Sequence, residues 1–398
     1  MRFRLYLFLS LGFLYCFTFL PQNQVLAEQS EFPPAQFLER PDVFPIGVWL
    51  QDPENALEYK AIGINFYAGL WQGPTESQLS QLQAARLAVF TPQNILALQN
   101  KYRDIIAGWM MPDEPDNAQA REGGGFGPPV LPDTLIDLYR EMKARDPERP
   151  ILLNLGQGVA WDQWHGRGTR TNHPEDYQDY VRAADILSFD IYPVTHRDSS
   201  VRGRLDFVAR GVNRLIGWSE GTKPVWSVIE ASRVSNADIL PTGNQVRNLV
   251  WLSIIHGAQG IIYFVHQFTP NFVEASLLEN DILREDITAI NKRLQSLARV
   301  LKSETLVDAV SIQPGRSSNQ SVSALVKQDN CHLYIFAGSI SKFSNEARFE
   351  IKDSQGLRDV EVMDEARHIP LDGGSFQDNF GPYATHLYKV SRNAAGCE

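Results

Sequence analysis

Between about residues 44 and 303 the sequence alternates short apolar runs with longer amphipathic stretches. The apolar runs are nearly continuous and rich in β-branched and aromatic residues, which is typical of parallel strands buried on both faces. Eight such runs occur, at residues 44–50, 64–70, 87–90, 105–111, 150–155, 185–192, 224–229 and 260–265.

The stretches between these runs carry helix signals. Asp52 followed by Pro53 is typical of a helix N-cap with a proline in the first turn. Thr75 and Gln78 have the spacing of a capping box. Residues 282–301 repeat apolar positions at helical spacing. Eight strand–helix alternations predict an α/β fold of the (β/α)8 TIM-barrel type. The competing fold is a doubly wound open sheet, which usually has a glycine-rich phosphate loop after its first strand, and none follows residues 44–50.

After about residue 302 the pattern changes to short segments of period two, separated by turn residues. This pattern predicts a small antiparallel β-sandwich. The expected organisation is therefore a signal peptide at 1–27, an N-terminal extension at 28–43, a barrel at 44–303 and a β-sandwich domain at 304–398. The expected strands of the sandwich are residues 321–326, 332–336, 347–351, 360–363 and 385–390.

The first 27 residues have the three parts of a secretory signal peptide. Arg2 and Arg4 precede an uncharged apolar run at 5–20, and small residues lead to Ala27. The run is short for a membrane span. We expect cleavage after Ala27 and export to the periplasm or the extracellular space; an uncleaved anchor is the alternative.

Charge and cysteine content narrow the possible partners. The chain has 37 basic and 47 acidic residues and a net charge of −10, which argues against binding to nucleic acid or to an anionic membrane. Its eight His are scattered and no Cys cluster occurs, so we expect no metal and no cofactor. Without the signal peptide, Cys331 and Cys397 remain, either as one disulfide or as two thiols. The oligomeric state stays open.

In a β/α barrel the active site lies at the carboxyl ends of the strands. Glu114 follows the fourth run and Glu230 the seventh, so their side chains can converge across the barrel mouth. A pair of carboxyl groups in unequal environments is the machinery of glycoside hydrolysis, and aromatic rings can stack on sugar faces. The candidate substrate-binding residues near these strand ends are Trp49, Tyr67, Trp71, Asp113, Asn154, Trp161, Asp190, Tyr192 and His266.

The segment Gly-Trp-Met-Met-Pro-Asp-Glu-Pro at 108–115 resembles the strand-4 motif of the retaining glycoside hydrolases of clan A, which usually reads Asn-Glu-Pro. The resemblance implies that Glu114 is the acid/base, that Glu230 is the nucleophile and that Tyr192 is the tyrosine that often binds the nucleophile. It also implies a β-linked poly- or oligosaccharide substrate. Asp113 departs from the motif, because the clan's Asn commonly contacts the sugar 2-hydroxyl and an ionised Asp can only accept there. This departure leaves open which of Asp113 and Glu114 points into the cleft.

Several alternatives remain at this point. The main one is a non-catalytic carbohydrate-binding barrel, and a lyase or transglycosidase could use the same carboxyl pair. The basic stretch with His165, Arg167 and Arg170 is either a solvated loop or a recognition site for an acidic sugar. Retention of configuration requires the two carboxyl groups to lie about 5–5.5 Å apart. The sugar, and the choice between endo and exo action, are not determined.

Overall fold

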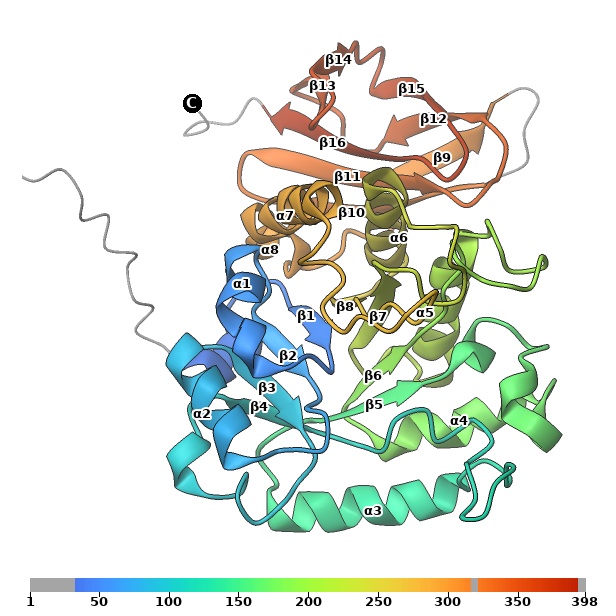
Figure 1. The fold of residues 1–398 in the computed structure, drawn as a ribbon. Coiled ribbons are helices and arrows are strands. Elements are labelled where there is room, and N and C mark those ends of the chain that lie inside the picture. Colours follow the sequence, from blue (N-terminus) through green and yellow to red (C-terminus); the bar gives the residue numbers. More distant parts are fainter. Residues whose placement is uncertain (1–32, 316–320, 393–398) are drawn as a thin grey trace, which may run out of the picture. The chain divides into compact units, whose positions relative to one another are not determined.

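The computed structural model describes residues 33–315 and 321–392; the expected signal peptide and Cys397 lie outside this part of the chain. Eight parallel strands form a closed barrel in sequence order (Figure 1), which confirms the predicted fold. Each strand lies within or beside one of the apolar runs, with its ends trimmed. The strands are β1 (Ile46–Trp49), β2 (Phe66–Ala68), β3 (Ala88–Thr91), β4 (Ile106–Met110), β5 (Ile151–Leu155), β6 (Ile186–Phe189), β7 (Val225–Glu230) and β8 (Gly260–Phe264).

Helices surround the barrel, and both expected start signals are confirmed. The side chain of Asp52 accepts from the backbone N–H of Glu54, and Thr75 and Gln78 form a reciprocal capping box. The connections after β3 and β5 differ from regular β/α units, since the former has only a 3₁₀ turn, η3 (Asn100–Tyr102), and the latter only short helical turns. The helices of the barrel are α1 (Ala56–Ala61), α2 (Glu76–Ala85), α3 (Pro132–Arg145), α4 (Tyr177–Tyr180), α5 (Asp206–Trp218), α6 (Gly243–Ile255), α7 (Asp281–Ser296) and α8 (Ala298–Leu301).

Large aromatic side chains fill the barrel interior near the start of the strands. The rings of Phe66, Phe90 and Trp226 contact one another at centroid distances of 5.0–5.7 Å. Phe37, from the 3₁₀ turn η1 (Pro34–Leu38) in the N-terminal extension, stacks on Phe66 at 5.3 Å. These rings pack the barrel interior below the cleft that opens at the carboxyl ends of the strands.

The C-terminal part consists of two antiparallel sheets, as the predicted sandwich requires. Five strands form one sheet in the order β10-β11-β16-β13-β14, and three form the other in the order β15-β12-β9. Three of the eight strands, β9, β14 and β15, were not expected from the sequence. The strands are β9 (Val310–Pro314), β10 (Val322–Gln328), β11 (His332–Ser339), β12 (Asn345–Ile351), β13 (Leu357–Val362), β14 (Arg367–Ile369), β15 (Ser375–Phe380) and β16 (Thr385–Arg392).

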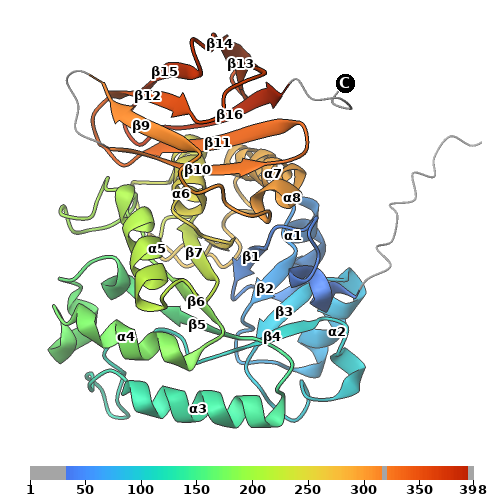
Figure 2. The same cartoon turned by 180° about the vertical axis from the view of Figure 1, so that it is seen from behind.

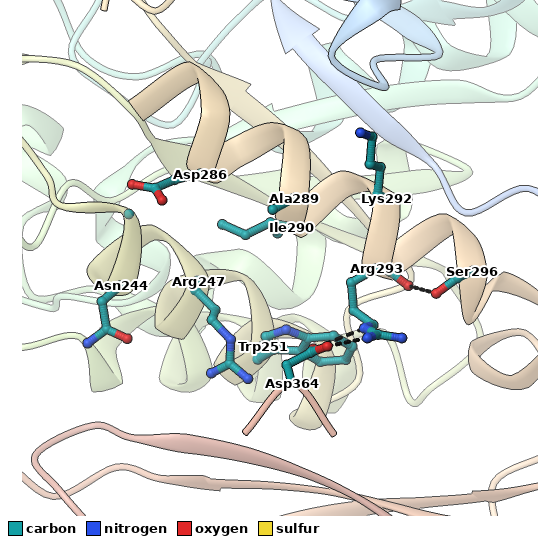
Figure 3. Close-up of a pocket in the computed structure, with 11 residues that line it drawn as sticks. Asn244, Arg247, Trp251, Asp286, Ala289, Ile290, Lys292, Arg293, Ser296 and Asp364 are labelled. Atoms are coloured by element: carbon teal, nitrogen blue, oxygen red, sulfur yellow. Dashed lines mark hydrogen bonds and ion pairs between the residues drawn. The ribbon is translucent and has the colours of Figure 1, made fainter. Parts of the chain in front are cut away.

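The larger sheet packs against α6 and, through β10, against α8, as the view from behind also shows (Figure 2). Trp251 on α6 stacks on Phe336 of β11 at a centroid distance of 5.4 Å. Around this apolar contact, Arg293 on α7 pairs with Asp364 in the turn after β13 (Figure 3). Arg247 donates to the hydroxyl of Thr385 at 2.8 Å. The contact joins barrel and sandwich through a buried aromatic stack with polar groups at its edge.

Two smaller observations complete the fold. Within residues 33–315 and 321–392 we find no helix with the length and apolar character that crossing a membrane requires. Cys331, one of the two cysteines whose state the sequence left open, is disulfide-bonded.

Candidate active site

A cleft of about 620 Å³ lies at the carboxyl ends of the barrel strands. Its walls come from the loops after β1, β2, β4, β5, β6, β7 and β8, so residues far apart in sequence meet there. The lining residues are Trp49, Leu50, Gln51, Asp52, Trp71, Gln78, Asp113, Glu114, Gln157, Trp164, Asp190, Tyr192, Val234, Phe264, His266, Phe268, Phe272 and Glu274.

Glu114 enters the cleft from the turn after β4. Its backbone has a φ of 42°, a left-handed conformation that costs energy for a residue with a side chain and that is common at functional sites. The backbone N–H of Glu114 donates to the carbonyl of Asn154 at 3.1 Å, which fixes the turn to β5. A Cβ on Gly156 would lie 3.0 Å from Oε1 of Glu114, so this glycine leaves room for the carboxyl group.

The carboxyl groups of Glu114 and Asp190 both line the cleft and lie close enough to interact directly. A hydrogen bond between them requires a proton on one of the two groups, since two carboxylates only accept. Burial, and then the nearby carboxylates of Asp190 and Asp113, raise the pKa of Glu114 well above its ordinary value. Burial also raises the pKa of Asp190, but the hydrogen bonds from Glu114 and Tyr192 oppose this rise. The pKa of Glu114 is raised well above its ordinary value and that of Asp190 to about 7, so Asp190 is the member of the pair that ionises first.

The remaining contacts of Asp190 are few. Its Oδ2 accepts from the hydroxyl of Tyr192 at 3.0 Å. Its Oδ1 has no N–H or hydroxyl donor among the described residues, although the side chain is only 6% exposed. A buried carboxylate oxygen without such a donor is costly, so the Glu114 proton or a bound ligand has to satisfy it.

Amide side chains orient the acid groups of the β4 turn. Asn117 donates from Nδ2 to Oε2 of Glu114 at 2.8 Å and accepts from the indole N–H of Trp164 at 2.9 Å. Asn154 donates to Oδ1 of Asp113 at 2.9 Å. Both Asp113 and Glu114 line the cleft, which answers the question of which one faces it. Desolvation, as the largest cause, raises the pKa of Asp113 to about 6.

Glu230 lies at the end of β7 but does not line the cleft. It is 0% exposed, and its oxygens accept from the backbone N–H groups of Val194 and Thr195, at 2.5 and 3.1 Å, and from the Thr195 hydroxyl at 2.9 Å. Burial raises its pKa to about 7, although these three donors act in the opposite direction. Tyr192, in the loop after β6, and Phe264, at the end of β8, contact each other at a centroid distance of 5.0 Å and line the cleft instead.

Aromatic rings form one wall of the cleft. A pair of backbone hydrogen bonds of 2.9 Å between Gln267 and Val273 closes the loop after β8. This loop presents Phe268 and Phe272, whose ring centroids lie 5.8 Å apart, and both stack on His266. Phe272 is 62% exposed, and Trp71, on the loop after β2, is 66% exposed. Exposed rings at a cleft are surfaces on which a sugar can stack.

The structure places most of the expected site residues in one cleft. Six of the nine expected substrate-binding residues line it together with Glu114: Trp49, Trp71, Asp113, Asp190, Tyr192 and His266. Tyr67 and Asn154 are buried outside the lining, and Trp161 packs beside Trp164 at 6.0 Å. Tyr192 contacts Asp190 rather than Glu230.

Sequence reasoning missed several residues of the site. Asn117 lies three residues after Glu114, and this spacing was the available signal. Phe268, Phe272 and Glu274 belong to a loop that the sequence marks only as a break between β8 and α7. The available signal was the presence of two phenylalanines in a loop, where few side chains fill a core. The sequence pattern does not show which way these side chains face.

The basic stretch at 165–170 does not serve the cleft. Arg167 is buried and donates to Asp176 at 2.8 Å, and Arg170 binds the same carboxylate. Neither arginine lines the cleft. The reading of this stretch as an acidic-sugar site therefore has no structural support.

Among the described residues, no group of three His, Cys, Asp or Glu side chains is arranged to hold a metal ion. The chemistry available in the cleft is that of carboxyl groups, amides and aromatic rings. An acid beside its ionised partner can donate a proton to a substrate oxygen.

No protein-family model and no curated protein matches the sequence. Among solved structures, the α-amylase of Geobacillus thermoleovorans in complex with acarbose is similar with a TM-score of 0.52 at 8% identity, covering 89% of this chain and 99% of that one. A family GH27 β-L-arabinopyranosidase of Geobacillus stearothermophilus has a TM-score of 0.48 at 11% identity, covering 92% and 99%. A GH30 xylanase of Clostridium acetobutylicum has 0.45 at 11%, covering 87% and 96%. The likeness to the α-amylase is one of fold.

Proposed function

We propose that this protein hydrolyses glycosidic bonds, with Glu114 as the proton donor and Asp190 as its partner carboxylate. The observation that carries the proposal is the adjacent pair of carboxyl groups, Glu114 and Asp190, in a cleft with exposed aromatic rings. Cleavage of a glycosidic bond needs one carboxylic acid that is protonated near neutral pH and one carboxylate that is ionised. The unequal surroundings of these two groups supply both states.

In this mechanism Glu114 protonates the oxygen of the leaving sugar. Asp190 either attacks the anomeric carbon as the bond to the leaving sugar breaks, or activates a water molecule for that attack. After direct attack, water deprotonated by the Glu114 carboxylate hydrolyses the glycosyl–Asp190 bond and releases the sugar. Asn117 keeps the Glu114 carboxyl group in place, and the Tyr192 hydroxyl does the same for Asp190. Trp71 and Phe272 offer faces on which neighbouring sugar units of the substrate stack.

Asp190 takes the role that the motif resemblance gave to Glu230. Asp190 lines the cleft and contacts Glu114, whereas Glu230 is fully buried and directed toward the backbone of residues 194–195. Glu114 and Asp190 are near enough to share a proton, whereas retaining enzymes hold their carboxyl groups about 5–5.5 Å apart, so a bound sugar has to enter between them. Retention stays a prediction, which proton NMR of the first-formed anomer tests.

Two further parts of the proposal rest on sequence alone. The motif at 108–115 favours β-linked glycans, and the N-terminal sequence favours export after cleavage near Ala27. Mass spectrometry of the N-terminus of the protein secreted by its host tests the second part. A mature N-terminus at residue 28 would support it, and an intact Met1 would contradict it.

The function is tested by hydrolysis of a broad panel of poly- and oligosaccharides with the mature protein. We expect cleavage of at least one member, and we expect Glu114→Gln to lower kcat at least about 100-fold because the amide cannot donate an acidic proton. Glu279→Gln, an exposed surface change after the aromatic loop, is the matched control. Equal rates for Glu114→Gln and the control would contradict the role of Glu114.

One observation favours a second function, a sugar-binding barrel without catalysis. The acid at the end of β7 is sequestered from the cleft, although the motif resemblance implied a nucleophile at this position. A binding protein would bind an oligosaccharide of the panel and cleave none. Its affinity would also survive Glu114→Gln, because the amide has nearly the shape of the protonated acid.

A further inference from the structure

The charge of the cleft lining has one sign. Five carboxyl groups line it, and none of its lining residues is Lys or Arg. Burial lowers the pKa of His266, so this imidazole is neutral near pH 7. Arg233 donates to Gln267 at 3.3 Å but does not line the cleft. The five acids are Asp52, Asp113, Glu114, Asp190 and Glu274.

Two of these acids lie on neighbouring loops, and no Lys or Arg is among the described residues that line the cleft beside them. The loop after β1 carries Asp52 and the loop after β8 carries Glu274, and Oε1 of Glu274 accepts from the backbone N–H of Asp52 at 2.6 Å. Burial, followed by the charges of Asp52 and Glu54, raises the pKa of Glu274. A positive group in the cleft would lower the repulsion between these carboxylates.

A second observation is independent of this acidic pair. Asp190 is 6% exposed, and its Oδ1 has no N–H or hydroxyl donor among the described residues. The proton of Glu114 can satisfy it only while Glu114 keeps that proton, and the proposed reaction removes it. The cleft thus contains a buried acceptor that needs a donor from the ligand.

The aromatic wall suits the same kind of ligand. The exposed faces of Phe268 and Phe272 lie in the same loop as Glu274. The face of an aromatic ring attracts a cation as well as the C–H face of a sugar. An ammonium group has three donors and no acceptor, which matches a lining rich in acceptors.

From these observations we infer that the cleft takes glycans that carry free amino groups, such as oligomers of hexosamine units, and disfavours glycans with carboxylate or sulfate groups. The ammonium groups pair with Asp52 and Glu274 near the aromatic wall, and the sugar rings stack on Phe268 and Phe272. This inference names a substrate class for the proposed function. Its consequence for catalysis rests on that function, whereas its consequence for affinity is tested separately by binding.

The test compares two oligosaccharides that differ only in acetylation, a glucosamine oligomer and the N-acetylglucosamine oligomer of equal length and linkage. Calorimetry with Glu114→Gln, which lacks turnover under the proposal, measures both affinities at about pH 6. We expect the amino form to bind at least about tenfold more tightly at low salt. High salt, about 0.5 M, should remove most of this advantage because it screens charge.

Two variants locate the contact. Glu274→Gln should weaken binding of the glucosamine oligomer about fivefold or more and leave the acetylated oligomer unchanged. Glu279→Gln, an exposed acid of the same region outside the cleft lining, should change neither affinity. A uronate oligomer should bind more weakly than either sugar.

The outcomes separate this inference from the proposed function. Equal or tighter binding of the acetylated oligomer, or no binding of either, overturns the inference even if wild type hydrolyses another glycan. Selective binding of the amino oligomer, without hydrolysis of any glycan by wild type, supports the inference and contradicts the proposed function.

Discussion

One proton shared by Glu114 and Asp190 governs the proposed chemistry. Burial disfavours two charges at this place, so the pair holds a single proton near neutral pH. The protonated form of Glu114 and the ionised form of Asp190 together make the active state. The titration belongs to the pair, so each limb of a pH profile reports the pair and not one residue alone.

The pH dependence of kcat/KM follows from these pKa directions. Acidification protonates Asp190, and because the pKa of Asp190 is raised, activity should begin to fall well above the pH at which an ordinary aspartate titrates. Alkali removes the proton of Glu114, whose pKa is also raised, so activity should persist above neutrality. We expect a bell-shaped profile whose acidic limb lies near neutral pH, because the pKa of Asp190 is raised to about 7. An acidic limb near pH 4 would contradict the raised pKa of Asp190.

The identity of the acid residues could be predicted better than their orientation. The motif at 108–115 predicted that Glu114 or Asp113 faces the cleft, and both do. Asp190 was expected only as a substrate contact. Glu230 was expected to face the cleft, but the backbone N–H groups of residues 194 and 195 hold its carboxyl group. That arrangement depends on the path of the loop after β6, which hydrophobic patterning does not describe.

The loop between β8 and α7 supplies the exposed aromatic wall. Its backbone bonds between Gln267 and Val273 hold Phe268 and Phe272 on one side. Neither ring has a core to stabilise, because both are largely exposed. The proposed function gives these rings a role as surfaces on which a sugar stacks.

Replacing Phe272 should therefore affect binding more than chemistry. We expect Phe272→Ala to raise KM for the substrate about fivefold to 20-fold and to change kcat less than about twofold, as for loss of one stacked ring. Steady-state kinetics measure both constants. Phe343→Ala removes a similarly exposed ring from the C-terminal part and is the control. An unchanged KM for Phe272→Ala would mean that this ring does not stack on the sugar.

Strand positions followed from the sequence where burial was strong. All eight runs of the barrel became strands because each is buried on both sides and bounded by turns or helix caps. The missed strands have weaker patterns: β14 has three residues, and β9 is partly exposed along its length. Their place in the sheets depends on pairing with β13 and β12, which a local pattern does not show.

Barrel and C-terminal sheets stabilise each other through a contact that is apolar at its centre. Trp251 is 1% exposed and stacks on Phe336. Arg293 and Asp364 lie at the edge of the same contact and are about one-third exposed. Buried apolar area contributes more to stability than exposed ion pairs do.

Two substitutions at this contact should therefore differ in effect. We expect Trp251→Ala to lower the free energy of unfolding by about 3–5 kcal/mol, and Arg293→Gln by less than about 1 kcal/mol. Chemical denaturation followed by circular dichroism measures both. If the two losses were equal, the aromatic stack would not be the main link between barrel and sheets.

The assignment of the second carboxylate is tested most directly by comparing Asp190→Asn with Glu230→Gln. Both variants are assayed for kcat/KM on a glycan that wild type cleaves, with rates normalised to the folded fraction from circular dichroism. We predict that Asp190→Asn lowers kcat/KM at least about 1,000-fold, because the partner carboxylate is gone. Glu230→Gln should lower the free energy of unfolding by about 1–3 kcal/mol, because the Glu230 carboxyl group binds the backbone and hydroxyl of residues 194–195. It should lower kcat/KM less than about tenfold. The reverse result, an active Asp190→Asn and an inactive but folded Glu230→Gln, would contradict the account and make Glu230 the second catalytic carboxylate.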